Sequence, residues 1–193
     1  SQGVVTWGVV LRRLMTKALT QDRAPDYRRP ARRWLALEGS ARQRGTDQPA
    51  FLPATRQDRE LPRIVIGLDT SGSVDTLRLK NFAAQVTAIA RRARAELHLL
   101  VFDLTVRSHT RLTGPNIAER IANIAFARDG GTSFVVVIEE AVALDPSIIV
   151  ILTDLEGPFG RKAPTCPVIW ALPGEAPAPR KGPPFGRVLS LSR

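Results

Sequence analysis

The chain has 193 residues, 44% of them hydrophobic and 24% charged, with a net charge of +10, which is ordinary for one soluble globular domain with an extension. The single cysteine, Cys166, excludes an internal disulfide, and no apolar run reaches the roughly 18 residues that a membrane span needs. Arg12 and Arg13 interrupt the N-terminal apolar run, which argues against a signal peptide. We therefore expect a cytoplasmic protein with no membrane partner.

The positive charge is concentrated in the N-terminal third of the chain. Residues 1–63 hold 13 Lys and Arg against 6 Asp and Glu, whereas residues 64–193 hold 15 against 12. A basic extension can bind nucleic acid or an acidic partner. Few aromatic side chains lie between these charges to stack on bases, so we do not expect nucleic acid to be the main partner.

Two different segments precede the regular part of the sequence. Residues 4–19 predict an amphipathic helix, because apolar residues recur there at helical spacing. Residues 20–63 contain five prolines, two glycines and many charges, which indicates an irregular arm that can include a short ordered piece around residues 32–37. We expect a helix and a basic irregular arm over residues 1–61, followed by a folded domain over residues 62–193.

From residue 64 onward, strand patterns and helix patterns alternate. The predicted strands are 64–69, 97–103, 147–153, 168–172 and 187–191, the predicted helices are 75–94, 116–125 and 133–144, and the alternating residues 105–112 predict an antiparallel edge strand. Strands joined through helices pair in parallel by right-handed crossovers. The sequence therefore predicts a three-layer, doubly wound α/β domain with a mostly parallel sheet and one antiparallel edge strand.

Oxygen-bearing side chains follow three of these segments. Asp69, Ser71 and Ser73 come at the end of the first buried strand, Thr132 follows a Gly-Gly pair before a helix, and Asp154 follows the apolar strand over 147–153. Loops of the first and fourth strands meet at the switch point of a doubly wound sheet, where ligands bind. Carboxylates and hydroxyls are ligands that Mg²⁺ accepts, so we expect a hard-cation site here.

These positions resemble the metal-ion-dependent adhesion site of the von Willebrand factor type A (VWA) family. The D-x-S-x-S element is residues 69–73, the threonine stands in Asp-Gly-Gly-Thr-Ser, and the last aspartate stands in Leu-Thr-Asp. The resemblance covers about residues 62–191. It implies a Rossmann-like VWA fold with Asp69, Ser71, Ser73, Thr132 and Asp154 as ligands of Mg²⁺ or Mn²⁺. It also implies a protein partner whose Asp or Glu carboxylate takes an open metal position, with Thr132 then binding the metal directly.

A narrower resemblance concerns residues 25–33 and 183–188. These segments are similar to bacterial cytoplasmic VWA-like proteins, whose longer members carry a metallopeptidase-like domain upstream and are associated with MoxR-type AAA+ ATPases. The resemblance implies that this chain is the C-terminal part of such a protein and works beside such an ATPase. Because the chain contains no His-Glu-x-x-His, we expect any peptidase-like domain to lie upstream and the chain itself not to be an enzyme.

Two alternatives to an interaction module stay open. A hydrolase could use one Mg²⁺, with Asp154 or Glu156 as the base acting on a bound water, and the basic arm could bind nucleic acid. Other reactive residues carry little support. His98 and His109 lie within predicted strands, Cys166 has no His-Asp pair near it in sequence, and the glycines form no G-x-G-x-x-G. We expect no catalytic residue and no nucleotide cofactor.

Overall fold

The computed structural model describes residues 6–20, 25–30, 32–47, 50–51, 53–55, 61–71, 76–124, 131–173 and 182–191. The chain divides into two compact units: one contains Ser1–Leu19 and Leu61–Arg193, and the other contains Thr20–Glu60. Each unit is described by itself below. In the described part of the chain, no helix is long and apolar enough to cross a membrane.

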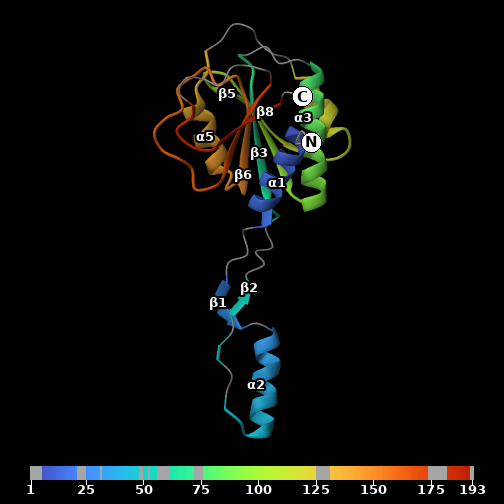
Figure 1. Ribbon diagram of the computed structural model, residues 1–193, viewed down its shortest axis with the longest axis vertical. Helices are drawn as coiled ribbons and strands as arrows, with labels where there is room; N and C mark the ends of the chain where they lie inside the picture. Colours follow the sequence, from blue (N-terminus) through green and yellow to red (C-terminus); the bar gives the residue numbers. More distant parts are fainter. Residues whose placement is uncertain are drawn as a thin grey trace, which may run out of the picture. The chain divides into compact units, whose positions relative to one another are not determined.

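The first unit is built on a six-stranded sheet with the order β5-β4-β3-β6-β7-β8 (Figure 1). The strands are β3 (Arg63–Asp69), β4 (Glu96–Phe102), β5 (Val106–Leu112), β6 (Ile148–Leu152), β7 (Val168–Leu172) and β8 (Arg187–Ser190). All neighbouring pairs are parallel except β4 and β5, which pair antiparallel at one edge. The predicted fold class and the edge strand are therefore confirmed, with strand ends within a residue or two of those expected.

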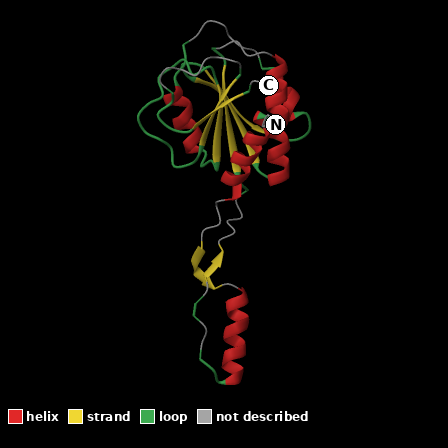
Figure 2. Cartoon of the chain, viewed as in Figure 1, coloured by secondary structure: helices red, strands yellow, loops and turns green. Residues whose placement is uncertain are grey.

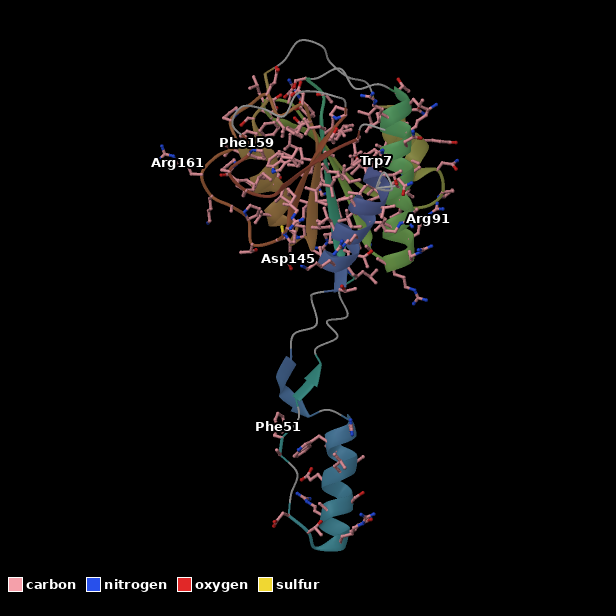
Figure 3. All side chains as sticks on the ribbon, viewed as in Figure 1. Trp7, Phe51, Arg91, Asp145, Phe159 and Arg161 are labelled. Carbon is pink, nitrogen blue, oxygen red and sulfur yellow. The ribbon has the colours of Figure 1, made fainter. Side chains whose placement is uncertain are left out.

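Helices cover both faces of this sheet, which gives three layers (Figure 2). On one face, α1 (Trp7–Thr20), α3 (Thr76–Ala93) and α4 (Ile117–Ala122) bury apolar side chains against the sheet. On the other face lies α5 (Phe134–Ala143), joined by the loop after β6. Phe159 of that loop stacks on Phe134, with ring centroids 4.8 Å apart (Figure 3). The central strands are apolar on both sides because both faces are covered.

Helix α1 belongs to the α/β unit and not to the basic segment that follows it. Leu11 and Met15 are fully buried in the same apolar cluster as the residues of α3 and the sheet. Trp7 at the start of the helix packs against this cluster (Figure 3). The amphipathic pattern over residues 4–19 is thus explained by packing on the sheet. This grouping differs from the expected division into residues 1–61 and 62–193.

The second unit is more regular than the predicted irregular arm. It contains β1 (Pro25–Pro30), α2 (Arg32–Arg44) and β2 (Pro53–Thr55), and the two strands pair antiparallel. Proline is tolerated here because both strands of a two-stranded ribbon are edges. The helix α2 has an i,i+4 ion pair between Glu38 and Arg42 at 3.0 Å. The ordered piece expected at residues 32–37 is thus part of a longer helix, because helix-forming residues continue through residue 44.

Candidate metal centre

Asp69 lies at the carboxyl end of β3, at the topological switch point of the sheet. The chain leaves β3 toward β4 on one side and leaves β6 toward β7 on the other, and β3 and β6 are neighbours. Loops that diverge in this way are where open α/β sheets bind their ligands. The Asp69 side chain is 2% exposed. A buried carboxylate needs hydrogen-bond donors or a cation to offset its lost hydration.

Hydroxyl groups from three segments surround this carboxylate. Ser71 donates to Asp69 Oδ1 from its backbone N–H at 3.0 Å and from its hydroxyl at 2.6 Å. The Thr132 hydroxyl lies 3.2 Å from Oδ1 and 3.3 Å from Oδ2, and it also contacts the Ser71 hydroxyl. The Thr153 hydroxyl donates to Oδ2 at 2.7 Å. One carboxylate and three hydroxyls thus converge at the end of the sheet.

Backbone contacts hold Thr132 in this position. The next residue, Ser133, donates its N–H to the Asp103 carbonyl at 3.0 Å, and Phe134 donates to the Pro158 carbonyl at 3.1 Å. Gly157 approaches so closely that a Cβ built there would lie 2.8 Å from the Thr132 carbonyl oxygen. The loop after β6 therefore packs directly on the threonine, which links the two segments mechanically.

An ion pair between Arg107 and Asp103 stabilises the turn between β4 and β5. Arg107 donates to Asp103 at 2.7 Å, and the Thr105 N–H donates to the same carboxylate at 3.0 Å. The hydrogen bond from Arg107 and the one from Thr105 hold the pKa of Asp103 below its usual range. Asp103 is therefore ionised and occupied by its own turn, which agrees with a turn-starting role.

The structure brings together only some of the five residues predicted from the sequence. Asp69, Ser71 and Thr132 come together through direct contacts. Asp154 is half-buried after β6, and its carboxylate accepts the Glu156 N–H at 3.0 Å. Among the described residues, no hydrogen bond joins Asp154 to the other three, and Ser73 lies outside the described residues. That all five bind a metal together stays a prediction.

Thr153 is the contact that sequence reasoning missed. It is the polar residue between an all-apolar strand and Asp154, and its side chain is 1% exposed. The signal was present, because a threonine that ends a buried strand beside a carboxylate must find a buried hydrogen-bond partner. Only the pairing of β3 with β6 shows that this partner is Asp69.

The donor set fits a small hard cation. Carboxylate and hydroxyl oxygens are the ligand types of Mg²⁺ and Mn²⁺, whereas His and Cys would suit softer metals. Asp69, Ser71 and Thr132 could hold such an ion, and Asp154 at the same end of the sheet would make a second carboxylate available. Two carboxylates balance the charge of a divalent cation, which would remove the cost of burying Asp69 uncompensated.

Two family models match the chain. A model described as "VWA-like domain (DUF2201)" matches residues 64–192, which is more than half of the chain, so the chain belongs to this family of VWA-like domains. Membership indicates a metal-associated interaction module. A second model, described as "Putative metallopeptidase domain", matches residues 1–56. No curated protein is significantly similar to the chain.

The second match corrects one expectation. We expected the chain not to be an enzyme and any peptidase-like domain to lie upstream of it. This is wrong, because residues 1–56 themselves match a metallopeptidase family model, which points toward peptidase activity. The matched segment includes α1, whose apolar face lies in the core of the α/β unit. The segment that matches the metallopeptidase model therefore contributes a helix to the hydrophobic core of the VWA-like domain.

Proposed function

We propose that the chain binds Mg²⁺ or Mn²⁺ through Asp69, Ser71, Ser73, Thr132 and Asp154, and that this site captures a carboxylate of a protein partner. The observation that carries the proposal is the convergence of the Ser71 and Thr132 hydroxyls on the buried Asp69 carboxylate at the switch point. They are three of the five residues that we propose as a metal-ion-dependent adhesion site. The contact between Asp69 and Thr132 joins residues 63 positions apart, which local turn chemistry does not require.

The residues of the site would divide the work of binding. Asp69 and Asp154 supply negative charge, and Ser71, Ser73 and Thr132 supply neutral oxygens. A divalent cation held by these residues would supply a Lewis acid for an incoming carboxylate. Because the three hydroxyls are neutral, the proposed ligand set carries no more than two negative charges, and an open position on the cation could accept a partner carboxylate.

The partner is proposed from the resemblance to bacterial VWA-like proteins. We propose an acidic segment of a protein associated with a MoxR-type AAA+ ATPase, or of that ATPase. Since such an ATPase itself uses Mg²⁺ with its nucleotide, dependence of the complex on Mg²⁺ would not identify this site. The site is tested by comparing ATPase binding of the unmodified chain and of Asp69→Ala at the same Mg²⁺ concentration. Equal ATPase binding by both would contradict this choice of partner.

Calorimetric titration with Mn²⁺ and Mg²⁺ tests the metal site itself. The chain should bind one ion, and Asp69→Ala and Asp154→Ala should each lose most of the affinity because a charged ligand is removed. Glu156→Ala is the matched control, since Glu156 is an exposed carboxylate in the same loop. Absence of saturable binding to either ion, or equal binding by Asp69→Ala, would overturn the proposed function.

A further inference from the structure

The Thr153 hydroxyl has its single proton committed to Asp69. Leu155 donates its backbone N–H to Thr153 Oγ1 at 3.1 Å, so at that contact the hydroxyl can only accept. Its proton is then available for Asp69 Oδ2, which lies 2.7 Å away. The donor and acceptor roles of this hydroxyl therefore follow from its neighbours.

This hydroxyl connects the two loops that carry the carboxylates. Thr153 directly follows β6, and its N–H donates to the Ala171 carbonyl of β7 at 3.0 Å. Through Oγ1 it reaches Asp69 on β3 and also closes the turn that contains Asp154. In that turn, the buried Leu155 has a φ of 69°, in the left-handed region that non-glycine residues rarely adopt. One side chain thus orients the first carboxylate and shapes the turn of the second.

Thr153 differs from the other hydroxyls around Asp69. Ser71 and Thr132 contact each other as well as the carboxylate, and both are proposed metal ligands. Thr153 is outside the proposed ligand set, so its hydrogen bond to Oδ2 can persist whether or not a cation is bound. Partners of this kind orient a ligating group and are needed for full metal affinity.

We propose that Thr153 is a positioning residue of the metal site, whose hydroxyl fixes the Asp69 carboxylate and the turn of Asp154. The inference rests on the proposed function, because it concerns affinity for the same cation. It adds a residue that is not a metal ligand and that would set how tightly the ligands hold the ion.

The test compares Mn²⁺ affinity by calorimetry in the full chain and in Thr153→Val and Thr153→Ser. Valine has the shape of threonine without its hydroxyl, so Thr153→Val should weaken Mn²⁺ binding by about 10- to 100-fold, whereas Thr153→Ser should keep near-normal affinity. Thr70→Val is the matched control. Thr70 is also buried and adjoins Asp69 in sequence, but its hydroxyl donates to the Phe102 carbonyl at 3.2 Å, so its Mn²⁺ affinity should be unchanged.

The outcomes separate this proposal from the function on which it rests. Normal Mn²⁺ affinity in Thr153→Val, with binding by the unmodified chain intact, overturns the role of Thr153 alone. No Mn²⁺ binding by the unmodified chain overturns both. If circular dichroism shows Thr153→Val to be unfolded, Thr153→Ser and Thr153→Ala replace it, because they differ only in the hydroxyl. Equal Mn²⁺ affinities in that pair overturn the proposal.

Discussion

At the scale of single residues, the site is organised around one buried carboxylate and its donors. Asp69 accepts hydrogen bonds from Ser71 and from Thr153, and the Thr132 hydroxyl lies within hydrogen-bond distance. This arrangement satisfies the carboxylate by protein groups alone, so the fold can form before a cation arrives. Asp69, Ser71 and Thr132, three of the proposed ligands, are thus already in mutual contact, which would lower the ordering cost of binding a cation.

At Gly157 the structure leaves no space for a side chain. A Cβ there would meet the Thr132 carbonyl oxygen at 2.8 Å and the Thr132 Cβ at 3.2 Å. Gly157→Ala should therefore displace Thr132, lower stability by about 1–3 kcal/mol and weaken Mn²⁺ binding. Calorimetry and thermal unfolding measure both effects. Gly182→Ala is the control, because a Cβ there meets no described atom within 4 Å. Normal metal affinity in Gly157→Ala would show that the loop yields instead.

Thr87 in α3 is a buried polar residue. Its hydroxyl finds no hydrogen-bond partner among the described residues. Thr87→Val keeps the side-chain shape and removes the unsatisfied group, so it should raise the free energy of unfolding by about 1 kcal/mol. Thr70→Val should change it in the opposite direction, because that hydroxyl is bonded. Urea unfolding of the two variants compares them, and a destabilised Thr87→Val would contradict the prediction.

At the scale of elements, the antiparallel pair β4 and β5 carries a second polar cluster. His98 on β4 is 8% exposed, and its Nδ1 lies 2.9 Å from His109 Nε2 on β5. Its Nε2 lies 3.4 Å from Glu96, which Arg63 and Arg111 also bind. That neither histidine is catalytic stays a prediction. Their pairing across the two strands was not predicted from the sequence.

This cluster should make stability depend on pH. Burial lowers the pKa of His98 below its usual range, and the facing His109 and Arg63 act in the same direction, against the hydrogen bond to Glu96. The unfolded chain then binds more protons than the folded chain near the usual histidine pKa, so stability should fall as the pH drops from about 7 to about 5. Urea unfolding across this range should show a flatter dependence in His98→Gln. Identical pH dependence in both proteins would contradict this assignment.

At the scale of the whole molecule, the two compact units do not coincide with the two family matches. The metallopeptidase model covers residues 1–56, yet α1 packs in the α/β unit and only Thr20–Glu60 forms a unit of its own. The VWA-like domain thus depends on a helix that its own family model does not cover. Removal of that helix would expose the apolar face of the sheet that it buries.

Leu11→Ala measures this dependence. Leu11 is fully buried, so the substitution should lower the free energy of unfolding of the α/β unit by about 2–5 kcal/mol. Val9→Ala in the same helix is the control, because Val9 is 54% exposed and its loss should cost about 0.5 kcal/mol or less. Equal stability of the two variants would mean that α1 is not part of this core.

Much of the fold could be predicted because local patterns and the final structure agree. Residues 64–68 and residues 148–152 contain no polar side chain, which is typical of central parallel strands. The helix stripes of α3 and α5 match the faces that they bury. The ribbon of the second unit was not predicted, because its strands contain prolines and form through pairing between residues distant in the sequence.

By itself, the sequence determined the order of strands and helices in the α/β domain and the kinds of oxygen-bearing side chain at their ends. Periodicity and residue chemistry are local, and they are written in adjacent positions. Only the tertiary structure decided that Thr153 donates to Asp69, that Gly157 lies against Thr132, and that α1 completes the core. These contacts join residues far apart in sequence, and they exist only once β3 and β6 lie side by side and both faces of the sheet are covered.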